Sequence, residues 1–254
     1  MNVLVCVKRV PATGARIVLT ADEREIDTRF LGFTVSPHEE CAVEEAVRLV
    51  EAHGGETTVL TLGPEAAVEQ LWDALALGID RAVLLETDGR EWDAGATAHA
   101  IVEAIGAHSA AGTEYDLLLF GNESADSGGY QVGVRVAHAL GLPCVTGVKA
   151  LEIRDGTAVA RREASRAWEV FELALPAVVT VKEGINLPRY PSIPGRLKAK
   201  RAPIERTVQE WPGNGLDTVR LRLPEEREKQ LVILGHGPEA APRAVEVLLE
   251  LGLV

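Results

Sequence analysis

The sequence has 254 residues, which suffices for one large α/β domain or two small ones. Hydrophobic residues make up 46% and charged residues 25%, and this composition excludes disordered and fibrous proteins. The 38 acidic and 26 basic side chains give a net charge of -12, which argues against nucleic acid as a partner. No apolar run approaches the roughly 18 residues of a membrane-spanning helix, and residues 1–10 enter a strand pattern without a signal-peptide cleavage site. We therefore expect no membrane insertion and a cytoplasmic location.

Strand-like and helix-like segments alternate along the first part of the chain. Short β-branched or leucine-rich runs are each followed by a longer stretch with apolar residues three and four apart, as an amphipathic helix requires. This alternation predicts a parallel sheet with helices on its faces. The predicted strands are 3–7, 57–62, 81–86 and 116–120, and the predicted helices are 37–52, 64–77, 94–108 and 129–140. Ser36, Pro37 and Glu39 have the pattern of a capping box with proline at the first helical position, which marks the start of the first helix.

From Cys144 onward the pattern changes. Alternating segments at 145–153, 158–163 and 168–175, with a turn at Asp155 and Gly156, predict antiparallel strands at the edge of the sheet. The continuous β-branched run 177–181 is typical of a buried strand that returns to the main sheet. The three cysteines, Cys6, Cys41 and Cys144, are widely spaced, so they indicate neither a disulfide framework nor a zinc site.

The last part of the chain begins after Glu183 with a proline-rich stretch. We expect this stretch to run as an ordered extended arm, because its prolines exclude a regular helix or a central strand: Pro188, Pro191, Pro194 and Pro203. A short last strand at 231–234 and a last helix at 243–251 follow. We therefore divide the chain into an α/β domain at 1–182 and a C-terminal loop and arm at 183–254.

The segment 117–140 carries the most information about function. An apolar strand ends at Phe120, a polar turn with glycines runs from Gly121 to Gly129, and a helix begins near Tyr130. In a parallel sheet such a turn lies at the carboxyl edge, where ligands of open α/β folds bind. Free N–H groups at the helix start would hold a phosphate. The alternative is a tight turn capped by Asp126 or Ser127, and these residues alone do not decide between the two.

Several common active-site patterns are absent. No lysine follows a glycine, so the chain has no GxxxxGK[ST] phosphate loop. Gly235, Gly237 and Ala240 match GxGxxA, but too little chain follows for the second strand of a dinucleotide fold. Ser124 is not in a GxSxG turn, and the six histidines stand singly, so we expect neither catalytic residues nor a metal site.

The arm is basic within an acidic chain. Residues 187–206 have a net charge of +5, because one acidic residue, Glu205, stands against six basic ones: Arg189, Arg196, Lys198, Lys200, Arg201 and Arg206. A solvated basic arm is one interpretation. The other is a docking surface for acidic protein partners, with Ile193 as an exposed apolar anchor between Pro191 and Pro194.

Five stretches of the sequence together resemble the small, beta subunit of electron-transfer flavoproteins. They are VLVCVKRVP, SPHEECAVEEAVRL, GPEAAVEQLWDALALGIDRAVLL, GNESADSGGYQVG and LPAVVTVKEGINLPRYPSIPGRLKAKRAPIE, and the resemblance covers nearly the whole chain in order. It implies a three-layer α/β nucleotide-binding domain of the adenine-nucleotide α-hydrolase-like type, with an antiparallel edge. It also implies a C-terminal arm that wraps the larger alpha subunit, which holds most of the FAD. The beta subunit of the common form buries an AMP that takes no part in catalysis.

The resemblance also implies which residues bind the AMP. They are Cys6, Ser36, Pro37, His38, Glu39, Leu62, Gly121, Asn122, Glu123, Ser124, Ala125, Asp126, Ser127, Gly128, Gly129, Tyr130, Gln131 and Val132. The chain departs from the family pattern in two places, where members often have Asn-Pro instead of Ser36-Pro37 and Asp-Gly-Asp-Thr instead of Asp126 to Gly129. An aromatic residue that members place near the flavin ring falls at about Thr13.

The function that the resemblance implies is electron transfer. The flavin would accept electrons from acyl-CoA dehydrogenases of fatty acid oxidation and pass them to a membrane quinone oxidoreductase. The arm around Ile193 would be the recognition loop, with Arg196, Lys198 and Lys200 beside it. Two alternatives stay open, namely a stand-alone adenine-nucleotide-binding or sensing module of the same fold, and an electron-bifurcating subunit with FAD in place of AMP.

Overall fold

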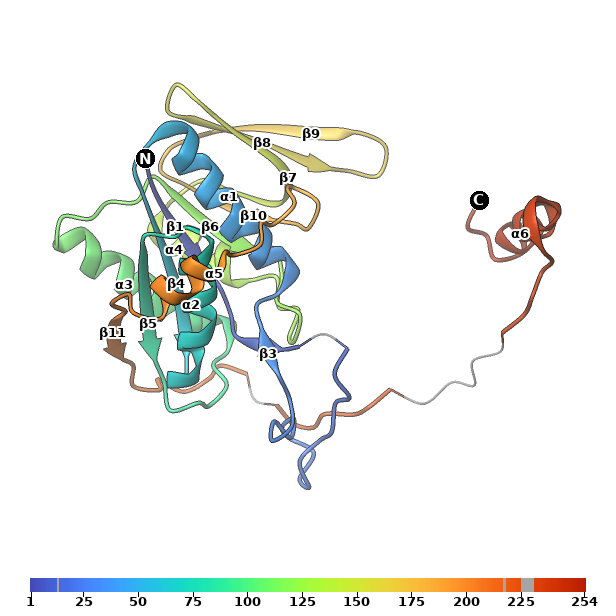
Figure 1. Ribbon diagram of the computed structural model, residues 1–254, viewed down its shortest axis with the longest axis horizontal. Coiled ribbons are helices and arrows are strands. Elements are labelled where there is room, and N and C mark those ends of the chain that lie inside the picture. Colours follow the sequence, from blue (N-terminus) through green and yellow to red (C-terminus); the bar gives the residue numbers. More distant parts are fainter. Residues whose placement is uncertain (13, 217, 225–230) are drawn as a thin grey trace. The chain divides into compact units, whose positions relative to one another are not determined.

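The structure is a computed structural model that describes residues 1–12, 14–216, 218–224 and 231–254 (Figure 1). Its contacts divide the chain into two compact units, Met1–Val219 and Arg220–Val254. The described residues of 183–219 are thus grouped with the first unit. The predicted division into an α/β domain at 1–182 and a C-terminal loop and arm at 183–254 stays a prediction.

A mixed sheet forms the centre of the first unit. Among the described residues it has nine strands in the order β11-β5-β4-β1-β6-β10-β7-β8-β9, of which β7, β8 and β9 pair antiparallel and the rest pair parallel. A separate ribbon pairs β2 (Val10–Pro11) with β3 (Phe33–Thr34). The strands of the sheet are β1 (Asn2–Cys6), β4 (Glu56–Gly63), β5 (Arg81–Glu86), β6 (Leu117–Gly121), β7 (Cys144–Arg154), β8 (Thr157–Glu163), β9 (Trp168–Ala174), β10 (Ala177–Val181) and β11 (Glu205–Val208).

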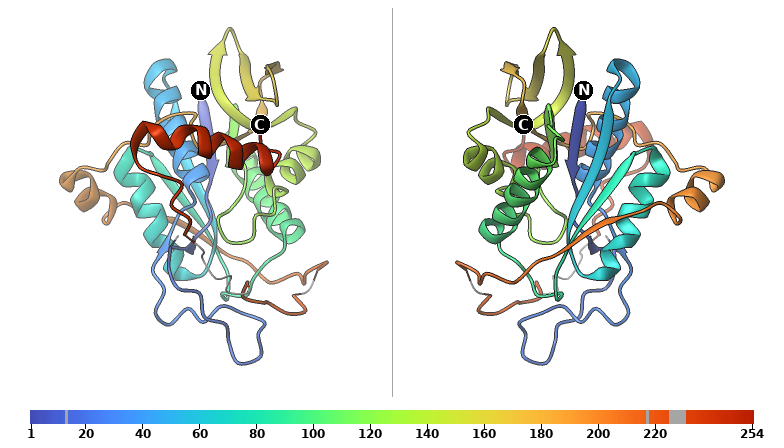
Figure 2. Two further views of the ribbon diagram at one scale, coloured as in Figure 1. Left: turned by 90° about the vertical axis from the view of Figure 1, so that its right-hand side faces the viewer. Right: turned by 90° about the vertical axis from the view of Figure 1, so that its left-hand side faces the viewer.

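Helices cover both faces of the sheet, which confirms the predicted three-layer α/β fold (Figure 2). One apolar cluster joins α1 and α2 to one face, and α5 packs on α2; a second cluster joins α3 and α4 to the other face. The helices of the first unit are α1 (Pro37–His53), η1 (Glu65–Ala67), α2 (Val68–Leu77), α3 (Ala94–Ala110), α4 (Val132–Leu140) and α5 (Ile193–Ala199). The second unit has η2 (Gly237–Ala240) and α6 (Ala241–Glu250). No described helix is long and apolar enough to cross a membrane.

The central strands consist almost entirely of apolar residues because both faces of the sheet are covered. All five residues of β10 are buried, as are four of the five in β1 and in β6. From β1 the chain adds β4 on one side and β6 on the other. The switch point of the sheet therefore lies between β1 and β6, and ligands of open α/β folds bind at such a point.

Two predictions for the last part of the chain were wrong. The proline-rich stretch contains the helix α5, because Pro194 occupies its first turn, where a missing N–H costs nothing, and the hydroxyl of Ser192 accepts a hydrogen bond from the Gly195 N at 3.1 Å. Residues 231–234 form no strand and are exposed, since the described residues of the second unit offer no strand to pair with. The structure also adds β11, which pairs parallel with β5 at the edge of the sheet.

Two side chains attach the proline-rich stretch to α1. The guanidinium of Arg189 binds the carboxylate of Glu44 at 2.9 and 3.2 Å and that of Glu51 at 2.7 and 3.0 Å. The amide of Asn186 donates to Cys41 O and to Glu45 Oε2, both at 2.9 Å. Glu44 and Glu45 are 5% and 6% exposed, so these bonds supply partners for two nearly buried carboxylates. The segment 186–189 is thereby fixed on the domain.

Candidate functional site

The predicted site residues meet where β1 and β6 end. Cys6 and Phe120 pair across the two strands, and Gly121 is the last residue of β6. The hydroxyl of Ser36 accepts a hydrogen bond from Ala125 N at 2.9 Å, which joins the start of α1 to the turn after β6. Leu62 lies in the neighbouring strand β4, two residues beyond the partner of Cys6. The structure therefore brings the three predicted segments to one edge of the sheet.

The start of α1 is tightly built, as the sequence predicted. Ser36 is 2% exposed and forms a capping box with Glu39, whose carboxylate accepts from Ser36 N at 3.2 Å. Pro37 occupies the first helical position. A Cβ atom on Gly121 would come within 2.6 Å of Glu39 Cγ, so the end of β6 can approach α1 this closely only because residue 121 is a glycine.

Glu39 is an unusual carboxyl group. Its burial raises its pKa to about 8, although hydrogen bonds from the backbone N–H groups of Lys8 and Ser36 partly oppose the shift. The thiol of Cys6 lies near it, and burial followed by the Glu39 charge raises the pKa of that thiol. At neutral pH Glu39 is therefore largely uncharged, which reduces its repulsion of an anion bound at this edge.

The turn after β6 offers unpaired backbone donors. Among the described residues, the N–H groups of Gly129, Tyr130 and Gln131 donate to no acceptor, and no side chain caps α4. Gly128 and Tyr130 have left-handed φ values of 56° and 54°. Left-handed residues within a turn form a backbone nest, in which successive N–H groups converge on an anion. We predicted that α4 begins at Gly129; it begins at Val132, because the left-handed Tyr130 cannot be helical.

His38 lies beside this turn and Asn122 lies within it, and the two differ in whether their side chains have a hydrogen-bond partner. The Nδ1 atom of His38 is buried without a hydrogen-bond partner, and its distance to Glu123 Oε1 is 3.9 Å. Burial lowers the pKa of His38, so the ring is neutral at pH 7. Asn122 Oδ1, in contrast, already accepts from the Thr180 hydroxyl at 2.9 Å. An unpaired buried nitrogen costs free energy, and a ligand at this place could satisfy it.

Lys8 is the site residue that sequence reasoning missed. It follows β1 by two residues, and its Nζ atom lies 2.7 Å from Asp126 Oδ2 and 2.9 Å from Glu91 Oε1. Burial works against its charge, yet the carboxylates of Glu91 and Asp126 raise the pKa of Lys8. Lys8 therefore fixes the turn after β6 to the loop after β5. The sequence signal that could have identified Lys8 is its position two residues after a buried strand.

The predicted partner-binding residues form a different surface. Ile193, Arg196, Lys198 and Lys200 lie on or directly after α5, and all four are exposed. Ile193 is 78% exposed, which confirms its predicted exposure. The helix α5 packs on α2, and a Cβ atom on Gly195 would lie 2.9 Å from Ala76 O, near the last residue of α2. Thr13, the predicted flavin-facing position, lies outside the described residues.

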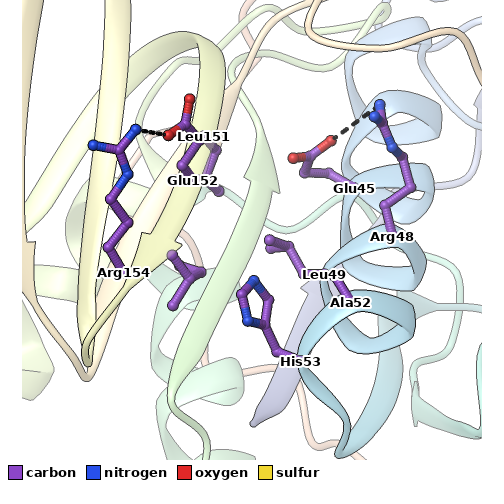
Figure 3. A pocket seen from close by; sticks show the side chains of 9 residues that line it. Glu45, Arg48, Leu49, Ala52, His53, Leu151, Glu152 and Arg154 are labelled. Carbon is purple, nitrogen blue, oxygen red and sulfur yellow. Dashed lines mark hydrogen bonds and ion pairs between the residues drawn. The ribbon is translucent and has the colours of Figure 1, made fainter.

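A cleft of about 300 Å³ lies between the end of α1 and β7 (Figure 3). Its lining includes the apolar residues Leu49, Ala52, Leu151 and Ile153, and its arginines are already paired: Arg48 with Glu45 at 4.0 Å, and Arg154 with Glu152. None of these residues belongs to the predicted sites. Over the described ranges, no group of three or more His, Cys, Asp or Glu side chains is placed to hold a metal ion.

The fold defines a three-layer α/β class of protein with a mostly parallel sheet and an antiparallel edge. The family model for the electron transfer flavoprotein domain matches residues 26–210. The chain is 35% identical to the electron transfer flavoprotein subunit beta of Bacillus subtilis, over 98% of this chain and 97% of that protein. It is 35% identical to the subunit beta of Mycobacterium leprae, over 99% and 93%, and 38% identical to that of Syntrophomonas wolfei, over 80% and 78%. The chain belongs to the electron transfer flavoprotein family, as a relative of its beta subunits.

Proposed function

We propose that this chain is the beta subunit of a heterodimeric electron-transfer flavoprotein and that it binds one AMP at the ends of β1 and β6. The observation that carries the proposal is the run of unpaired N–H groups at Gly129, Tyr130 and Gln131, at the switch point of the sheet. Such a run, followed by a helix start without a side-chain cap, suits a phosphate.

The residues present fit an adenylate in four respects. The nest supplies donors for the phosphate, and the neutral Glu39 adds little negative charge. The unpaired Nδ1 of His38 can take a partner. Lys8 fixes the turn through Asp126, so less conformational entropy is lost when the nucleotide binds. In this proposal AMP has no part in catalysis and stabilises the folded chain by mass action.

Electron transfer itself depends on FAD, which we propose lies at the interface and is held mainly by an alpha subunit. When bound, the flavin supplies the redox chemistry, while the protein positions it and tunes its electrostatics. We propose no catalytic residue in this chain. Acyl-CoA dehydrogenases would donate the electrons, a membrane quinone oxidoreductase would accept them, and the complex would work in the cytoplasm.

The surface around α5 is the proposed docking site for the electron-donating dehydrogenase. Ile193 is exposed beside three cations, and an apolar anchor with a basic rim suits an acidic partner. We expect Ile193→Ala to slow electron uptake at low dehydrogenase concentration without loss of FAD. The matched control is Leu187→Ala, since Leu187 is 89% exposed but lies outside α5. Equal uptake by Ile193→Ala and the wild type would exclude this role.

The nucleotide content distinguishes the proposal from its alternatives. We would co-express the chain with its alpha subunit, denature the purified complex and identify the released nucleotides by mass. One FAD and one AMP per heterodimer supports the proposal, whereas two FAD indicate an electron-bifurcating subunit. A colourless, nucleotide-loaded monomer that binds no partner indicates a stand-alone module.

A further inference from the structure

The chain between β11 and Leu216 is fixed to the loop that joins β5 to α3. This loop contains Asp93, which caps α3 by accepting a hydrogen bond from Ala96 N on its Oδ1 atom at 2.8 Å. The other oxygen, Oδ2, accepts from Gly215 N at 2.6 Å and from Leu216 N at 3.3 Å. One carboxylate therefore joins the start of α3 to a segment more than a hundred residues later.

Asn214 completes this arrangement from the other side. Its Oδ1 atom accepts from Asp93 N at 2.9 Å, and its Nδ2 atom donates to Glu91 O at 3.1 Å. We call Asp93 and Asn214, with the bonds that they make, the Asp93 clamp. The backbone N–H of Ala96, followed by those of Gly215, Gly95 and Leu216, holds the pKa of Asp93 below its usual value. The charged form is thus the one that the clamp uses.

Other contacts hold the chain between β11 and the clamp. Gln209 N donates to Glu86 O at 2.7 Å, directly after the four residue pairs of β11 and β5. The guanidinium of Arg90 lies 5.0 Å from the ring centroid of Trp211. The clamp is the last of these contacts before Val219, where the first unit ends.

We propose that Asp93 is a positioning residue for partner binding, which fixes on the α/β domain the place from which the C-terminal segment begins. The inference rests on the proposed function, because it assumes that this segment binds an alpha subunit. A segment that starts from a fixed place has a shorter free tether and loses less conformational entropy on binding. The described residues of Arg220–Val254 are all at least partly exposed and include many apolar side chains, so they have surface to bury against such a partner.

The variant Asp93→Asn separates the two roles of this carboxylate. Asparagine is as good an N-cap as aspartate, so the amide oxygen can still accept from Ala96 N. The NH₂ group would then face the N–H groups of Gly215 and Leu216, donor against donor, and release the segment. The control is Asp88→Asn, which removes the same charge from the same loop at a residue that contacts Arg90 and, within the part of the chain that the structure describes, no residue after 208.

The first measurement is amide hydrogen exchange in the isolated full-length chain. We expect exchange at Gly215 and Leu216 to accelerate about tenfold or more in Asp93→Asn, as the loss of one charge-assisted hydrogen bond implies. Protection of Ala96 should not change, and Asp88→Asn should match the wild type. Unchanged exchange at Gly215 and Leu216 would overturn the clamp.

The second measurement is the affinity of each variant for the companion alpha subunit. We expect Asp93→Asn to weaken binding about three- to tenfold, as the cost of ordering a few more residues implies. Equal affinity of Asp93→Asn and wild type would overturn the positioning role. If the wild-type chain binds no alpha subunit at all, the proposed function fails, and the positioning role fails with it, whatever the exchange data show.

Discussion

The two units of the chain differ in the burial of their apolar side chains. The first unit buries them in two clusters, one on each face of its sheet. In the second unit no described residue is buried, and Leu231, Val232 and Ile233 are 88%, 69% and 68% exposed. A monomeric protein seldom exposes so many large apolar residues together. The first unit therefore contains its own core, whereas the described residues of the second unit form none, and in the proposed function an alpha subunit covers their apolar side chains.

The largest expected effect comes from removing the second unit. A chain that ends at Val219 should keep the α/β fold but bind an alpha subunit at least about 100-fold more weakly, since two or three buried apolar side chains alone contribute about 3 kcal/mol. Sedimentation of mixtures measures the complex, and circular dichroism checks the fold. The control is Arg243→Gln in the full chain, because the ion pairs of Arg243 to described residues lie within α6, with Glu246 and Glu250. An unfolded truncated chain would show that the units are not independent.

A smaller effect is expected inside the first unit, where packing is tight. Gly121→Ala places a Cβ atom 2.6 Å from Glu39 Cγ and 3.1 Å from Glu39 N, so β6 and α1 must move apart. Overpacking of this kind costs about 1–3 kcal/mol, and we expect the proposed binding of AMP to be lost as well. Urea unfolding measures the free energy. Gly106→Ala is the control, because Gly106 lies within α3 with open space around its Cβ position and should gain up to about 1 kcal/mol.

The smallest effect depends on pH and concerns Glu39. Its pKa rises from 4.5 in the unfolded chain to about 8 in the folded one, so the folded state binds the proton more tightly. The contribution to stability is therefore full below pH 4.5, decreases as the pH rises toward 8, and is constant above that. Glu39→Gln should remove this dependence and be more stable than the wild type at pH 9 by roughly 1–2 kcal/mol.

A second measurement on Glu39 compares the rate of AMP release at different pH values in the wild type and in Glu39→Gln. Because an ionised Glu39 repels a phosphate, the wild-type chain should release AMP faster above pH 8 than at pH 6, and Glu39→Gln should not. Lys8 and Asp126 face the same edge but keep their charges between these pH values, and burial raises the pKa of the Cys6 thiol, which therefore stays protonated. The other groups that titrate are His38 and the phosphate of AMP, whose second pKa is about 6. Equal pH dependence in the variant and the wild type would assign the effect to His38 or to the phosphate, and not to Glu39.

The sequence by itself determined much of the first unit. The period of its apolar residues predicted the parallel strands, the antiparallel edge and the four helices, because buried faces require that periodicity wherever they occur. The capping box at Ser36 and Glu39 was also readable, since a helix start depends on a few adjacent residues. The family resemblance named the strand-end segments, and the structure brings them together.

The tertiary structure alone decided what depends on residues far apart in the chain. No local pattern in the sequence predicts three of these features. They are the pairing of β11 with β5, the ion pairs of Lys8 and the hydrogen bonds of Asp93 with Gly215 and Leu216. The helix α5 formed in spite of its proline, because that proline lies in the first turn. Local sequence determines which elements can form, but only packing determines which distant groups come into contact. Here those contacts bring the predicted site residues to one edge of the sheet and attach Gly215 and Leu216 to the start of α3.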